Sequence, residues 1–127
     1  MLRVKEIYMR MCLSSTELHV LTSEERQALQ AHLRLMYKNI EEVFERHGLT
    51  IVFACGSLLG AERPGVFIPW DDDLDVYMPR EDYDRLINVY ADELPSNYIV
   101  YAPNSKNGPT YQFAKIIDKS NFFIAIL

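Results

Sequence analysis

Four aspartates crowd into five positions of an otherwise apolar stretch, FIPWDDDLDVYM at residues 67–78. They are Asp71, Asp72, Asp73 and Asp75. Carboxylates at this spacing repel one another, and removing them from water costs free energy. A divalent cation offsets both effects, and Mg²⁺ prefers oxygen ligands, commonly one or two protein carboxylates together with substrate phosphates. The cluster therefore predicts a site for Mg²⁺ or Mn²⁺ of the kind that serves phosphoryl transfer.

The alternation of charged and apolar residues in DLDVYM, residues 73–78, indicates how these carboxylates are presented. It predicts a half-buried strand. Residues i and i+2 of a strand project to the same face. We therefore expect Asp73 and Asp75 to bind the metal together, and Asp71 to join them if the extended conformation begins early. Asp72 is expected to point the other way, into solvent.

Known acidic motifs of other classes match the cluster less well. An EF-hand loop starting at Asp71 needs Gly at its sixth position and Glu at its twelfth, which here hold Val76 and Asp82. A haloacid-dehalogenase-type phosphatase places its DxD motif after an apolar strand, whereas Pro69 and Trp70 precede it here. A glycosyltransferase that uses sugar nucleotides and a DxD metal motif stays open as an alternative, as does a solvated acidic turn.

A second motif, CGSLLGAE at residues 55–62, lies just upstream. A buried strand is predicted at residues 49–55, and it runs into Gly56, Ser57 and a helical turn. Gly56 lets a ligand approach the backbone closely, Ser57 offers a hydroxyl group, and the amides at a helix N-terminus attract anions. A Gly-Ser pair alone is weak evidence. Its position before the strand that carries the Asp-x-Asp motif predicts a phosphate-binding site.

The flanking elements predict an α/β (α+β) fold. Thr22 and Glu25 form a capping box that begins a helix, Gly48 ends it, and its core-facing stripe is Leu29, Leu33, Met36, Ile40, Val43 and Phe44. A second helix at 80–94 and strands at 97–102, 111–118 and 121–127 follow the aspartates. This order predicts a mixed sheet flanked by helices. Residues 1–21 are expected to be an N-terminal extension, and residues 22–127 one domain.

The composition limits the partners. Residues 71–84 hold seven acids and one base, whereas the rest of the chain, whose net charge is −5 overall, is close to neutral. This argues against nucleic-acid binding, which needs a basic face. The two cysteines, Cys12 and Cys55, have no zinc-like spacing. No signal peptide and no membrane span are predicted, so we expect a cytoplasmic protein. The apolar strand NFFIAIL, residues 121–127, is expected to pair with a second copy in a homodimer, or to be covered in a longer protein.

The order of these elements, strand, Gly-Ser, helix, loop and DxD strand, is similar to that of polymerase-β-like nucleotidyltransferases. More specifically, the sequence resembles the LicD family, phosphocholine transferases of bacterial glycans that are related to the fukutin and fukutin-related phosphotransferases. The residues that match the family signature are Gly56, Ser57, Leu58, Leu59, Gly60, Arg63, Ile68, Pro69, Trp70, Asp71, Asp72, Asp73, Leu74 and Asp75.

The resemblance implies a nucleotidyltransferase-like fold that moves a phosphoalcohol group, such as phosphocholine, from a CDP-linked donor. The acceptor would be a hydroxyl of a cell-surface glycan: lipopolysaccharide, teichoic acid or capsule. Asp73 and Asp75 would then be catalytic metal ligands, and Gly56 and Ser57 would hold donor phosphate. Further charge neutralisation on the pyrophosphate is expected from Arg63 and Lys115.

The resemblance carries three more expectations. Asp118, at the end of the AKIID segment, is predicted as a third metal ligand or general base, with a plain turn aspartate as the alternative. Trp70 is expected to pack before the metal strand, with stacking on a base or on choline as the alternative. Because family domains typically continue further, a truncated relative that binds nucleotide and metal without turnover is the remaining alternative. The three histidines receive no role.

Overall fold

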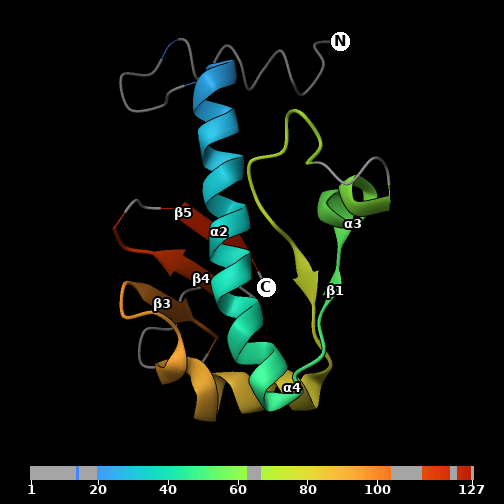
Figure 1. The fold of residues 1–127 in the computed structure, drawn as a ribbon, viewed down its shortest axis with the longest axis vertical. Helices are drawn as coiled ribbons and strands as arrows, with labels where there is room; N and C mark the ends of the chain where they lie inside the picture. Colours follow the sequence, from blue (N-terminus) through green and yellow to red (C-terminus); the bar gives the residue numbers. More distant parts are fainter. Residues whose placement is uncertain (1–13, 15–19, 63–66, 104–112, 121–122, 127) are drawn as a thin grey trace.

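The computed structural model of the chain describes residues 14, 20–62, 67–103, 113–120 and 123–126. One long helix, α2 (Ser23–His47), runs the length of the domain. Figure 1 shows β1, β2 and α3 on one side of this helix, the strands β3–β5 on the other side, and α4 across its C-terminal end. Helix α2 is therefore the element against which both groups of strands are placed.

Helix α2 begins and ends where the sequence predicts. The backbone N–H of Thr22 donates to Glu25 Oε2 at 2.8 Å, and the N–H of Glu25 donates to Thr22 Oγ1 at 3.2 Å. Gly48 ends the helix with a left-handed φ of 61°, which glycine adopts without strain. All six residues of the predicted stripe are buried: Leu29, Leu33, Met36, Ile40, Val43 and Phe44. The capping box, the terminus and the core face are confirmed.

The first sheet is a short antiparallel pair, β1 (Val52–Phe53) with β2 (Val76–Tyr77). Both strands are shorter than predicted, and the expectation of a buried strand at 49–55 is wrong, because Val52 is 54% exposed beside its partner Tyr77. Between them the chain forms α3 (Cys55–Glu62), the predicted helical turn. Residues 63–66, which include Arg63, lie outside the described part of the chain.

The second sheet has the order β3–β4–β5, with β3 (Tyr98–Tyr101), β4 (Lys115–Asp118) and β5 (Phe123–Ile126) all antiparallel. The chain reaches it through α4 (Arg80–Arg85), which continues into a π-helical turn at Leu86–Tyr90 and a 3₁₀ turn at Ala91–Glu93. The α/β class is confirmed. In detail, the described strands form two small antiparallel sheets on α2 where one mixed sheet was expected.

The hydrophobic core lies along α2. The buried stripe of the helix packs with residues of the turns that follow α4 and of the second sheet, namely Leu86, Leu94, Tyr98 and Ile116. Leu74 and Val76 are also buried, whereas the acidic residues around them are not. No helix in the described residues is long and apolar enough to cross a membrane.

Candidate functional site

Three aspartates converge on one point of the loop that precedes β2. Asp71, Asp72 and Asp73 each offer a carboxylate oxygen, and these oxygens lie within 4.8 Å of one another. Asp72 is exposed, as expected, but the expectation that it points away from the others is wrong, because residues 71–74 are not part of a strand and alternation does not govern them. Asp75 is not one of these three residues. Burial and the charge of Asp73 nevertheless raise the pKa of Asp75.

Asp71 is the most constrained member of the cluster. Its Oδ2 atom is buried and has no hydrogen-bond partner. Burial and the nearby carboxylates, chiefly Asp73, raise the pKa of Asp71 to about 6. A cation would satisfy the buried oxygen and relieve the repulsion, so the residues present fit a divalent metal ion.

The Gly-Ser turn is built directly against the aspartates. A Cβ atom at Gly56 would lie 2.5 Å from Asp71 Oδ2, so a side chain at this position would collide with the carboxylate. Ser57 Oγ accepts a hydrogen bond from the backbone N–H of Asp75 at 2.8 Å. Cys55, an exposed free thiol at the strand-to-helix junction, has a left-handed φ of 48°, unusual for a non-glycine residue. The two sequence motifs therefore form one structural unit.

Helix α2 holds the aspartate loop through its polar side chains. Gln30, 7% exposed, donates through Nε2 to the carbonyl oxygens of Ile68 at 3.1 Å and Asp71 at 2.9 Å. Arg26 Nη1 donates to the carbonyl oxygen of Trp70 at 2.9 Å. Sequence reasoning missed both residues. The available signal was a glutamine beside Leu29 in the buried stripe of an amphipathic helix, where an amide needs partners.

Asp118 is buried elsewhere, between α2 and the second sheet. Its Oδ1 accepts from Asn97 Nδ2, from the N–H of Ser120 at 2.9 Å and from Ser120 Oγ, and its Oδ2 lies 2.9 Å from His32 Nε2. Burial alone would raise the pKa of Asp118, but the hydrogen bonds from Ser120, Asn97 and His32 outweigh it and lower the pKa to about 2.

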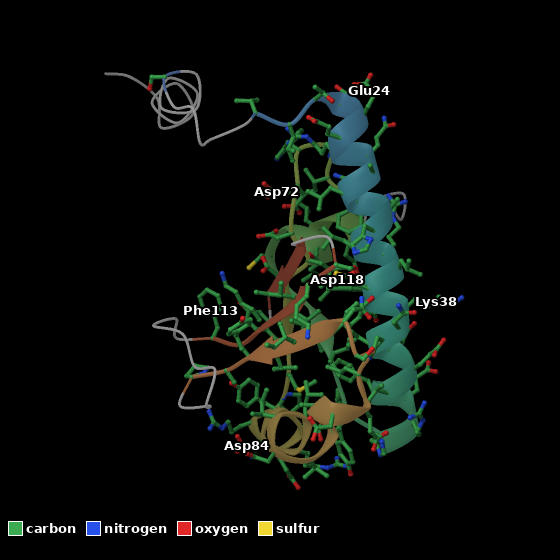
Figure 2. The ribbon with its side chains drawn as sticks, turned by 90° about the vertical axis from the view of Figure 1, so that its left-hand side faces the viewer. Glu24, Lys38, Asp72, Asp84, Phe113 and Asp118 are labelled. Atoms are coloured by element: carbon green, nitrogen blue, oxygen red, sulfur yellow. The ribbon has the colours of Figure 1, made fainter. Side chains whose placement is uncertain are left out.

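Asp118 is not among the converging carboxylates of the described residues. In Figure 2, Asp72 projects outward from its loop, whereas Asp118 lies among the side chains next to α2. The structure therefore gives Asp118 the contacts of a structural residue, and its predicted role as ligand or base stays a prediction. The pairing with His32, for which no role was predicted, joins residues 86 positions apart.

Lys115 and Trp70, two further residues of the sequence analysis, lie outside the group of converging carboxylates. Lys115 is on β4, with its ammonium group 5.5 Å from the centre of the Phe113 ring. Trp70 is 74% exposed, so the expectation that its ring packs before the metal strand is wrong. Its backbone is fixed by Arg26 while its ring remains in solvent, next to Asp71 in the sequence. An exposed indole beside the carboxylates is suited to stacking on a ligand.

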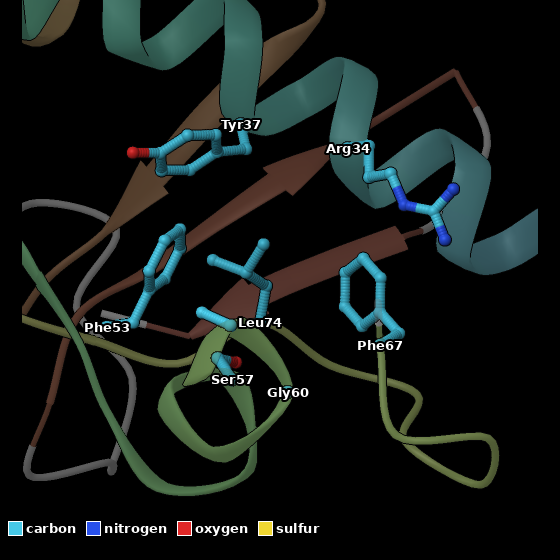
Figure 3. Close-up of a pocket in the computed structure, with 8 residues that line it drawn as sticks. Arg34, Tyr37, Phe53, Ser57, Gly60, Phe67 and Leu74 are labelled. Carbon is cyan, nitrogen blue, oxygen red and sulfur yellow. The ribbon is translucent and has the colours of Figure 1, made fainter. Parts of the chain in front are cut away.

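A largely apolar hollow of about 270 Å³ adjoins this unit. Figure 3 shows Phe53 and Phe67 on either side of Leu74, with Ser57 and Gly60 on α3 below them and Tyr37 and Arg34 on α2 above. Ser57 belongs both to this wall and to the hydrogen bond with Asp75. The hollow and the aspartate loop are thus joined through α3.

The sequence comparison places this arrangement in a known class. Residues 48–120 match the family described as "LicD/FKTN/FKRP, nucleotidyltransferase domain". This match covers the Gly-Ser turn, the aspartate loop and β4, and it extends over more than half of the chain. The chain therefore belongs to the LicD/FKTN/FKRP nucleotidyltransferase family, and the family resemblance found in the sequence is confirmed.

A curated relative narrows the comparison. The chain is 38% identical over 90 residues to lipopolysaccharide cholinephosphotransferase LicD from Haemophilus influenzae. The alignment covers 67% of this chain and 34% of the relative, so the chain spans about a third of the length of that protein. No solved structure matches the chain significantly. Family membership therefore identifies residues 48–120 as a LicD-type nucleotidyltransferase domain.

Proposed function

We propose that this domain transfers a phosphoalcohol group, such as phosphocholine, from a CDP-linked donor to a hydroxyl of a cell-surface glycan. The observation that carries the proposal is the convergence of Asp71, Asp72 and Asp73 on a loop fixed to the Gly-Ser turn. The relative's activity on lipopolysaccharide supports a glycan acceptor. The homodimer and the cytoplasmic location expected from the sequence stay predictions.

Mg²⁺ or Mn²⁺ would be held by the three converging aspartates, with Asp75 adding negative charge behind them. The fit rests on the buried, unpartnered Oδ2 of Asp71 and on the raised pKa of its carboxyl group. When bound, the ion would neutralise charge on the donor pyrophosphate, which is the main requirement of phosphoryl-type transfer.

The protein's own residues supply positioning. Gly56 leaves room for the Asp71 carboxylate, and Ser57 fixes Asp75 relative to α3. Gln30 and Arg26 fix the backbone of the loop from the other side. Since phosphoryl transfer depends on holding the reacting groups in line, a loop tied at both ends is an appropriate base for it. The ring of Trp70 is available to stack on the donor's base or on a quaternary ammonium group.

Calorimetric titration tests the proposal directly. CDP-choline, CDP-ribitol, CDP-glycerol and UDP-glucose are each titrated with Mg²⁺ and with EDTA, into the wild-type chain, Asp73→Asn and the exposed control Asp92→Asn. We expect a CDP-linked compound to bind only with Mg²⁺, and Asp73→Asn to abolish this binding. In an active form, release of CMP should fall more than about 100-fold in Asp73→Asn.

The same titration also distinguishes the alternatives. Preference for UDP-glucose would favour the sugar-nucleotide glycosyltransferase, and would contradict the proposal. Metal-dependent binding of CDP-choline without release of CMP, even with a glycan acceptor present, would identify a binding module. Metal-independent binding of every nucleotide would show that the aspartate loop does not bind nucleotides through a metal ion.

A further inference from the structure

A second cavity, of about 370 Å³, adjoins the first along α2, and Arg34 and Phe67 line both of them. One wall is the first half of α2, and the other is formed by Phe67 and Pro69. Its lining residues are Ser23, Arg26, Gln27, Gln30, Arg34, Phe67 and Pro69. We propose that this cavity binds a phosphorylated sugar, the acceptor, with Arg34 contacting its phosphate group and Arg26 contacting the rest of the ligand. The assignment to the acceptor rests on the function proposed above.

The lining of the cavity is positively charged. Two of its lining residues are arginines and none is acidic, although the chain as a whole has a net charge of −5. Within the described residues, Arg26 and Arg34 make no ion pair with an acid, whereas Arg46, Arg80 and Arg85 are each paired. Unneutralised guanidinium groups on one wall of a cavity attract an anion, and arginine binds phosphate through two parallel hydrogen bonds.

The two arginines are held in place before any ligand arrives. Arg26 donates to the carbonyl oxygens of Trp70 and Leu21, which fixes its guanidinium group and leaves other N–H groups available. The guanidinium of Arg34 lies 5.2 Å from the centre of the Phe67 ring. Arg26 therefore loses less side-chain entropy on binding than a free surface arginine does, whereas Arg34 is exposed and is oriented by the Phe67 ring.

The spacing of the arginines indicates the size of the ligand. They are eight residues apart on α2, which corresponds to about 12 Å along the helix axis. The side-chain amide of Gln27 and the hydroxyl of Ser23 line the same cavity. A ligand larger than a phosphate ion, such as a phosphorylated sugar, can contact both ends of this wall, and its hydroxyl groups match the neutral polar residues.

The position of the cavity relative to the carboxylates favours the acceptor over the donor as its ligand. Gln30 lines the cavity and also donates to the carbonyl oxygen of Asp71, so only the loop backbone separates the cavity from the carboxylates. The donor pyrophosphate is assigned to the carboxylates through the metal ion. A separate anion site with no acidic residue and no metal ligand then suits the second substrate.

The test uses the full chain and glucosamine 1-phosphate as the probe, titrated in EDTA. The variants are Arg34→Gln, Arg34→Lys and the control Lys38→Gln, which removes the same charge from an exposed position of α2 outside the cavity. We expect Arg34→Gln to weaken binding at least about tenfold and Lys38→Gln less than twofold. Arg34→Lys should recover part of the affinity, because it keeps the charge but not the bidentate geometry.

A parallel titration with CDP in Mg²⁺ separates the two substrates. We expect the affinity for CDP to be unchanged in Arg34→Gln, and glucosamine 1-phosphate to bind equally well when CDP is bound. Loss of probe binding without metal, or equal weakening by Lys38→Gln and Arg34→Gln, would overturn the site. A defect confined to CDP would overturn the assignment to the acceptor. Because the probe is measured in EDTA, these outcomes are independent of the metal-dependent donor binding that tests the proposed function.

Discussion

The hydroxyl of Ser57 accepts a hydrogen bond from the backbone N–H of Asp75 at 2.8 Å. This contact joins the N-terminal turn of α3 to the strand that follows the aspartate cluster. Together with the close approach of Gly56 to Asp71, it makes the Gly-Ser turn a support for the acidic loop. A residue predicted to hold phosphate therefore has a measurable second role, which is to position the carboxylates.

Ser57→Ala should lower the affinity for Mn²⁺ and the stability of the domain together. The variant leaves the N–H of Asp75 without its partner, which costs about 1–3 kcal/mol where the group is shielded from water. Ser57→Thr keeps the hydroxyl and should restore both quantities. Chemical denaturation and Mn²⁺ titration measure them, and an unchanged Mn²⁺ affinity in Ser57→Ala would show that the contact does not position the metal ligands.

Asp71→Asn should stabilise the metal-free protein and remove its response to metal. The buried Oδ2 of Asp71 faces three other aspartates and has no hydrogen-bond partner, so loss of its charge relieves repulsion of the order of 1–3 kcal/mol. Thermal melting with EDTA and with 10 mM Mg²⁺ is the measurement. In the wild type, Mg²⁺ at 100 times its dissociation constant should add about 2.7 kcal/mol. The exposed control Asp92→Asn should melt like the wild type, and destabilisation of metal-free Asp71→Asn would contradict the repulsion.

Gln30→Leu should destabilise the fold by about 1–3 kcal/mol and weaken metal binding. The substitution is nearly isosteric but leaves the carbonyl oxygens of Ile68 and Asp71 without their donor. Gln27→Leu, on the exposed face one turn earlier, is the matched control. If Gln30→Leu lowers the denaturation midpoint but leaves the Mn²⁺ affinity at the wild-type value, the two hydrogen bonds of Gln30 support only the fold.

Trp70→Ala should reduce the affinity for CDP-choline without altering stability. The ring is 74% exposed, so its loss removes little buried area, whereas stacking on a base contributes roughly 1–3 kcal/mol. Tyr77→Ala is the control, because Tyr77 is 67% exposed and lies on β2 beyond the loop. Calorimetric affinities that fall equally in the two variants, or in neither, would exclude stacking by Trp70.

Asp118 should make stability depend on pH in the acid range. The pKa of Asp118 is about 2 in the folded chain against 3.8 for an ordinary aspartate. A carboxyl group with a lower pKa in the folded state stabilises the protein above pH 4, and this stabilisation is lost as the pH falls towards 2. The contribution is about 2 kcal/mol. Urea denaturation between pH 7 and 2 should show a smaller acid loss in Asp118→Asn than in the wild type, and parallel curves would show that Asp118 is not the titrating group.

Much of the architecture could be predicted because it depends on near neighbours in the chain. The capping box of Thr22 and Glu25 spans three residues, and the buried stripe of α2 repeats with the helical period. The Gly-Ser turn and the aspartate motif are contiguous segments, and their residue types alone indicated the family that the comparison then confirmed. Such features need no knowledge of which distant segment lies opposite.

The arrangement within the site was decided by tertiary contacts. Alternation placed Asp72 away from Asp71 and Asp73 on the assumption of an extended chain, but the strand begins only after Leu74, and Gln30 and Arg26 hold the preceding loop in another conformation. The buried carboxylate of Asp118 lies 2.9 Å from His32 Nε2, a pairing that no local pattern in the sequence predicts. These partners are 41 to 86 residues apart in the sequence. Pairings over such distances are fixed by the packing of α2 against both sheets, because the core determines which polar groups are buried together and must satisfy one another.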